Sequence, residues 1–305
     1  MYDPRNAGHA GSTTRRAYRA TLALLAASML SACVNPVSSS LYQPAPLAAQ
    51  PAPWAGRAPT AIEARTADGL TLTGWYWAPE QPGGDILLFL PGRAGNRDIA
   101  ARQAEPFAAG GRGVMVASYR GYGDNPGTPD EPGLYRDGAA FADVASKLRG
   151  PGRLYLFGDG LGAAVALRLA SRTDVAATAT LGAFDRFANF APAAVRGFYA
   201  NAFDNIAAIG RVKTPVLIMH GRKDQVVPYS AAEALKAAAG GPAILAPIGG
   251  EAYHSVDFRH IAVTVWQAFD EMGRIAGRDP RADPAVPTPA TQPPLLATAP
   301  APANR

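Results

Sequence analysis

The feature that most constrains the fold of this chain is a glycine-rich turn, Gly158-Asp159-Gly160-Leu161-Gly162, between two apolar segments. The run before it, residues 153–157, predicts a buried strand, and residues 161–170 predict a helix. A strand that turns sharply into a helix through spaced glycines presents its central residue at the end of a sheet. The central residue here is Gly160, which has no side chain to present.

Strands and helices alternate along the middle of the chain. The predicted strands are residues 61–66, 70–78, 85–90, 113–118, 153–157, 176–181, 216–220 and 243–248. The predicted helices are residues 98–109, 133–148, 161–170, 229–239 and 255–275. Continuous apolar strands joined by helices favour a parallel sheet buried on both faces. The sequence therefore predicts an α/β fold with a mostly parallel central sheet, helices on both faces and a small or absent cap.

The N-terminal segment predicts export and lipidation. Arginines precede a short apolar run, residues 20–29, and Leu30-Ser31-Ala32-Cys33 resembles a bacterial lipobox. Residues 1–32 are then a lipoprotein signal peptide, and Cys33 carries lipid (palmitate) that binds the bilayer. The alternative is an ordinary signal peptide with a chance cysteine. Val34, in place of an inner-membrane retention aspartate, favours the outer membrane, with the protein facing the periplasm.

Composition divides the rest of the chain. Residues 33–59 are rich in Pro and Ala and predict an extended tether, residues 60–277 predict the folded domain, and residues 278–305 predict a disordered Pro/Ala-rich tail. The single cysteine leaves none for a disulfide. The net charge of +5 is modest and forms no basic stripe, so nucleic acid is not an expected partner.

Five segments resemble, in order and spacing, the serine aminopeptidase-like branch of the α/β-hydrolase superfamily. They are Leu90–Asn96, Ser118–Pro129, the turn at 158–162, Thr214–Pro228 and Tyr253-His254. The second contains Tyr-Arg-Gly-Tyr-Gly and the fourth Pro-Val-Leu-Ile-Met-His-Gly-Arg-Lys-Asp, which are the most specific. The first departs from the family in having Pro91, which lacks an N–H, where the family has histidine.

The resemblance implies a role for each site residue. A serine hydroxyl attacks only when a histidine takes its proton and a carboxylate orients that histidine. The family order of nucleophile, acid and histidine falls on Gly160, Asp224 and His254. The two backbone N–H groups of the oxyanion hole fall on Leu161 and Arg93. No metal or cofactor is implied.

Neighbouring residues offer alternatives to these assignments. His260 is the rival to His254, and His220 lies inside a strand, where a structural role is expected. Asp159 is the rival nucleophile, but shifting the turn by one residue places Phe157 and Leu161 where small residues are needed.

These observations together predict a membrane-anchored lipoprotein that is a pseudo-hydrolase. It keeps the acid and the histidine without the serine, and binds an unidentified small molecule or peptide, or acts as a scaffold. One alternative is an active ester or peptide hydrolase with a non-standard nucleophile. Another is a purely structural protein of the cell envelope.

Overall fold

The protein is described from a computed structural model that covers residues 41–49, 53–190, 193, 196–199, 202–249 and 256–275. The strands are β1 (Gln43–Pro44), β2 (Thr60–Arg65), β3 (Thr71–Trp77), β4 (Ile86–Leu90), β5 (Ala94–Gly95), β6 (Gly113–Val116), β7 (Leu154–Asp159), β8 (Ala177–Leu181), β9 (Val216–Gly221) and β10 (Ala243–Ile248). The α-helices are α2 (Arg97–Ala104), α3 (Glu131–Leu148), α4 (Leu161–Ala170), α5 (Asn205–Ile209), α6 (Tyr229–Ala238) and α7 (Phe258–Ile275). Short 3₁₀ segments are η2 (Glu105–Gly111), η3 (Phe187–Phe190) and η4 (Arg196–Tyr199).

The main sheet has eight strands in the order β10-β9-β8-β7-β4-β6-β3-β2. The pairs from β10 to β6 are parallel, whereas β3 pairs antiparallel with both β6 and β2. The carboxyl ends of β4, β6, β7, β8 and β9 therefore meet at one edge of the sheet. Ligand sites of open α/β sheets lie at this edge.

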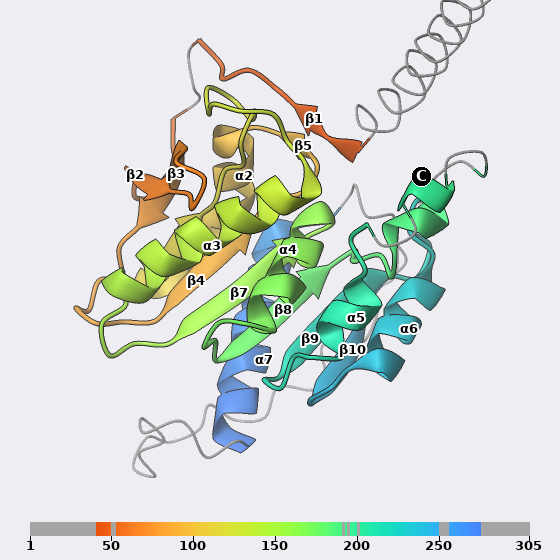
Figure 1. The fold of residues 1–305 in the computed structure, drawn as a ribbon. Coiled ribbons are helices and arrows are strands. Elements are labelled where there is room, and N and C mark those ends of the chain that lie inside the picture. Colours follow the sequence, from red (N-terminus) through yellow and green to blue (C-terminus); the bar gives the residue numbers. More distant parts are fainter. Residues whose placement is uncertain are drawn as a thin grey trace, which may run out of the picture.

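The alternation of side chains along β4 shows that both faces of the sheet are covered. Ile86, Leu88 and Leu90 pack into one apolar cluster with residues of α3, α4 and α6. Leu87 and Phe89 point the other way, into a second cluster with α2, η2 and α7. Figure 1 shows α3 and α4 on the near face and α7 crossing behind the sheet. The predicted fold class, a mostly parallel sheet with helices on both faces, is confirmed.

Two helices differ from the sequence-based prediction at their ends. The helix predicted over 98–109 is α2 followed by the 3₁₀ segment η2, because Pro106 lacks the N–H that an α-helix needs there. The helix predicted from residue 133 begins at Glu131. The side chain of Asp130 caps it by accepting from the Gly133 N–H at 2.6 Å.

The described part of the stretch predicted to be a tether lies against the domain. The strand β1 pairs in parallel with β5, and Leu41 is buried in the core. Further on, Trp54 meets the rings of Trp75 and Trp77 edge-on, and the Arg102 guanidinium lies 3.6 Å from its ring centroid. Residues 41–49 and 53–59 thus contact the folded domain instead of extending away from it. We call residues 41–49 the N-terminal strap.

None of the described helices combines the length and the apolar composition needed to cross a bilayer.

Candidate active site

The turn between β7 and α4 has the sharp geometry that the sequence predicts. Gly160 has φ +50° and ψ −107°. This positive-φ conformation is strained for residues that carry a side chain, whereas glycine adopts it at little cost. Its N–H donates to the carbonyl of Leu181 at 2.8 Å, which ties the turn to the end of β8. The residue at the tip of the turn therefore presents backbone only.

The flanking glycines fix the register of this turn. A Cβ on Gly158 would lie 2.5 Å from the Ala163 Cα, and a Cβ on Gly162 would lie 2.0 Å from the carbonyl oxygen of Leu90. Both distances are far below van der Waals contact, so neither position admits a side chain without backbone movement. Asp159, the last residue of β7, is buried and pairs with Leu181. Residue 160, and not 159, is thus the tip.

Two predicted oxyanion donors lie near this turn. Leu161 is the first residue of α4, so its N–H has no acceptor within the helix and lies at the positive end of the helix dipole. Arg93 lies in the loop of residues 91–96, which follows β4. Gly162 packs against the backbone of Leu90 and Pro91, so the start of α4 and the start of this loop are in direct contact. Backbone N–H groups at a helix start are a general site for anions and polarised carbonyls.

Side chains from elsewhere in the chain hold the loop of residues 91–96 in place. The hydroxyl of Tyr119 donates to the Pro91 carbonyl at 3.2 Å, and that of Tyr122 donates to the Arg93 carbonyl at 2.7 Å. The Gln43 N–H of the N-terminal strap also donates to Arg93, at 2.8 Å. Burial raises the pKa of Tyr119 and of Tyr122 above the ordinary value, so both stay protonated donors at neutral pH.

The second family-like segment supplies structure to the same edge. Arg120 is 8% exposed and contacts Asp137 at 2.7 Å and Asp68 at 2.8 Å. The hydrogen bond from Arg120 holds the pKa of the Asp68 carboxyl well below its usual range. The side-chain oxygen of Asn125 accepts from the Thr73 N–H at 2.8 Å. This network fixes the loop that carries Tyr119 and Tyr122.

Asp224 lies at the same edge of the sheet, three residues after β9 ends. Its side chain is 2% exposed, and its Oδ1 accepts from the backbone N–H groups of Val226 at 2.8 Å and Val227 at 2.9 Å. Since β8 separates β7 from β9, about 10 Å lies between the two strand ends. The loop is closed by its own hydrogen bonds, and Oδ2 lies 3.7 Å from the Nε2 of His220.

Of the three candidate histidines, the structure describes His220 and His260. The predicted catalytic residue, His254, lies outside the described residues. His220 is fully buried, and its Nε2 lies 2.8 Å from the Val227 carbonyl, so this nitrogen must carry the proton and donate. That bond gives His220 a structural part in the Asp224 loop. His260 is exposed in the first turn of α7.

A cluster of aromatic side chains follows β8, within the segment 184–210 that connects it to β9. Phe184, Phe187 and Phe203 are buried against one another. Phe203 has φ +45°, and among the described residues no other non-glycine has positive φ. Its N–H donates to Glu131 at 2.7 Å, and burial raises the pKa of that carboxyl. Strain of this kind gathers at functional sites. The sequence did not predict this strain, because a phenylalanine gives no sign that its φ is positive.

Within the described ranges, no three His, Cys, Asp or Glu side chains cluster closely enough to hold a metal ion.

The sheet order and the turn between β7 and α4 define an α/β-hydrolase fold, and the chain belongs to the α/β-hydrolase superfamily. No family model matches it. An uncharacterized protein of Mycobacterium tuberculosis is 35% identical over 189 residues, which cover 59% of this chain and 67% of that protein. A lysophosphatidylserine lipase of Danio rerio is 28% identical over 184 residues, covering 51% of this chain and 47% of the lipase.

Solved structures agree on the fold. The protein Est1E of Butyrivibrio proteoclasticus, solved with ferulic acid bound, superposes with a TM-score of 0.60 at 19% identity, over 71% of this chain and 100% of that one. An esterase of Pyrococcus furiosus superposes with a TM-score of 0.56 at 17% identity, over 78% of this chain and 98% of that one.

Proposed function

We propose that this protein is a lipid-anchored α/β-hydrolase-fold protein that lacks serine catalysis and works as a binding module. The observation that carries the proposal is Gly160. It occupies the tip of a turn whose backbone, at φ +50°, suits the strained nucleophile of a hydrolase, yet it offers no atom for attack. We also infer, from the sequence segments described above, that its relatives lie in the serine aminopeptidase-like branch.

The physical argument is that binding and attack depend on different parts of this site. The backbone donors of Leu161 and Arg93 do not depend on the residue at 160, so a carbonyl or carboxylate oxygen can still be bound there. A glycine at 160 removes backbone strain of about 1–2 kcal/mol that a serine imposes. Once attack is not needed, the stability of the fold favours glycine at this position.

The class of ligand is an ester or acyl compound. A relative named as a lysophosphatidylserine lipase and a structural neighbour solved with ferulic acid both point to acyl chemistry on this fold. The buried aromatic cluster after β8 packs into the same apolar cluster as Leu161, the residue after Gly160, so the surroundings of the turn on this face are apolar. A peptide is the alternative ligand, and a scaffold without a ligand is the structural alternative.

The anchor in this proposal is lipidated Cys33 in the outer membrane, facing the periplasm. It rests on the lipobox-like Leu30-Ser31-Ala32-Cys33. Metabolic labelling with an alkyne fatty acid tests it. The wild-type protein should be labelled and sediment with membranes, whereas Cys33→Ser should be unlabelled. Unlabelled wild-type protein in the cytoplasm would contradict the anchor.

Covalent labelling by a fluorophosphonate tests the loss of catalysis. The wild type should show no labelling, because labelling needs a nucleophile, and any ester hydrolysis should stay within the about 10³–10⁴-fold over the uncatalysed rate that serine proteases without their triad retain. Gly160→Ser should gain labelling if Asp224, His254 and the two N–H donors are aligned. Gly160→Ala is the matched control, because it adds the same strain without the hydroxyl. Robust labelling of the wild type would refute the proposal.

An active hydrolase with Asp159 as nucleophile is the rival function. Asp159 is a buried carboxylate next to the tip of the turn, which is the observation in its favour. The close packing of Gly158 and Gly162 places the tip at 160, which disfavours it. Turnover of an aryl ester that disappears in Asp159→Asn and persists in Gly160→Ala would establish this rival.

A further inference from the structure

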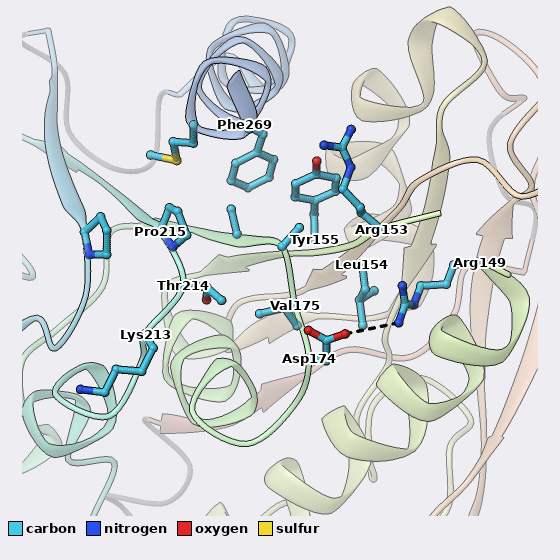
Figure 2. Close-up of a pocket in the computed structure, with 15 residues that line it drawn as sticks. Arg149, Arg153, Leu154, Tyr155, Asp174, Val175, Lys213, Thr214, Pro215 and Phe269 are labelled. Carbon is cyan, nitrogen blue, oxygen red and sulfur yellow. Dashed lines mark ion pairs between the residues drawn. The ribbon is translucent and has the colours of Figure 1, made fainter. Parts of the chain in front are cut away.

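A cavity lies at the opposite edge of the sheet from the turn at Gly160. Its volume is about 430 Å³, within the usual range for small-ligand sites. It opens at the amino ends of β7, β8 and β9, beneath the C-terminal half of α7 (Figure 2). The strand β7 runs from this cavity, at Leu154, to the turn after Asp159, so about 16 Å separates the two sites.

The walls of this cavity are mostly apolar. Tyr155 and Phe269 stack with their ring centroids 4.7 Å apart and are only 2% and 1% exposed, so they line the cavity with their edges; Figure 2 shows both rings along one side. Val175 and Met272 add aliphatic and thioether surface. A wall of this kind holds an aromatic or aliphatic body, because burying apolar surface there removes it from water.

One hydroxyl in the wall has no partner. The Oγ1 of Thr214 is buried and makes no hydrogen bond with the described residues. A buried polar group without a partner costs free energy, which a ligand oxygen would restore by hydrogen bonding. The Nε of Arg149, which also lines the cavity, is likewise buried and makes no hydrogen bond with the described residues.

The rim of the cavity is positively charged. The lining includes the cations Arg149, Arg153 and Lys213 and the carboxylate of Asp174, and Arg153 is already paired with Asp85 at 3.1 Å. Arg149 is 3.7 Å from Asp174, whose side chain is 96% exposed, and Figure 2 marks this ion pair. An exposed pair at this distance contributes little, so the Nη2 of Arg149 can exchange Asp174 for a ligand anion at small cost, while its Nη1 stays bound to the Gly152 carbonyl at 2.5 Å.

We propose that this cavity binds a small amphipathic carboxylate, with its aryl or alkyl body against Tyr155 and Phe269 and its carboxylate at Arg149. The single labile guanidinium and the apolar walls match a monoanion. A phosphate dianion would need several more donors than the walls provide. The inference is independent of the proposed function, because it uses no residue of the turn at Gly160.

The test is an NMR titration of the purified protein, ¹³C-labelled at the methionine methyl groups, with 4-phenylbutyrate. A ligand of this size should bind with a dissociation constant of about 1 mM. Met272 lines the cavity and its signal should shift, whereas Met115 and Met219, buried elsewhere in the sheet, should not. The neutral 4-phenylbutyramide and the ringless butyrate should each bind at least about fivefold more weakly.

Variants test the charge. Arg149→Gln should weaken binding about tenfold, whereas Lys236→Gln, an exposed cation on α6 outside the cavity, should leave it unchanged. Unmoved Met115 and Met219 signals in the variants report that the fold is retained. The proposal is overturned by the absence of any Met272 shift at about 20 mM ligand. Equal binding of the amide, or unchanged binding by Arg149→Gln, would overturn it as well.

Discussion

Replacing Asp137 by asparagine should strongly destabilise the fold, because it breaks a buried ion pair while leaving the shape unchanged. The Asp137 side chain is fully buried. It accepts from the Arg120 backbone N–H at 2.9 Å, from Nε at 3.0 Å and from Nη2 at 2.7 Å. An asparagine keeps one of these acceptors and turns an N–H₂ group toward the guanidinium.

The expected loss follows from what remains around Arg120. Breaking a buried pair costs about 3–5 kcal/mol, since the remaining charge stays buried without its partner. Asp68 still contacts the Nη1 of Arg120 at 2.8 Å, so the lower end of that range applies. A loss of about 3 kcal/mol lowers the melting temperature of a domain of this size by about 6–12 °C.

Urea unfolding followed by circular dichroism at pH 7 measures this loss. The matched control is Asp124→Asn, which removes the partner of Arg97 at a side chain that is 60% exposed and should cost less than about 1 kcal/mol. Equal effects of the two substitutions would refute the argument that burial sets the strength of the pair. The double variant Arg120→Met, Asp137→Leu should regain part of the loss, because it leaves no unpaired buried charge.

Three further outcomes are expected. Gly162→Ala should prevent stable folding, because its Cβ would lie 2.0 Å from the Leu90 carbonyl oxygen. The control Gly197→Ala places its Cβ in open space, so it should melt like the wild type in a thermal scan. Asp68→Asn should flatten the acid side of the stability curve. The pKa of Asp68 is lowered in the folded state by Arg120, so its contribution is present above about pH 4 and is lost as the pH falls further, which urea titrations at pH 2–7 would detect. Trp54→Ala should cost about 2 kcal/mol in urea unfolding through lost ring contacts; no loss would show that this residue does not hold its segment to the domain.

Local sequence patterns predicted the elements of the sheet well. The runs that became β4 and β9 are apolar without alternation, and both are buried over their whole length. The start of α3 was missed by two residues because Asp130 was not read as a cap, although Asp followed by Pro132 in the first turn is a start signal. The order of the strands depends on long-range packing, and no strand order was predicted.

In the candidate site, too, the local features were predicted from the sequence and the long-range contacts were not. The turn at Gly160 and the loop of Asp224 are local, so the sequence predicted their positions. The hydroxyls of Tyr119 and Tyr122 act on a loop nearly thirty residues earlier, and this long-range contact leaves no periodic pattern. The strap was missed for a related reason: Pro/Ala-rich composition indicates an extended backbone, but it does not say whether that backbone pairs with another strand.

The docking of the N-terminal strap has a consequence for how far the protein can reach from a membrane. If Cys33 is in the bilayer, the first described contact with the domain along the chain is at Leu41 and not at Thr60. About eight residues span at most about 28 Å, whereas the 27 residues from Cys33 to Thr60 would span about 95 Å. If Cys33 is lipidated, the hydrogen bond from the Gln43 N–H to the Arg93 carbonyl would also limit how far the domain can lie from the lipid surface.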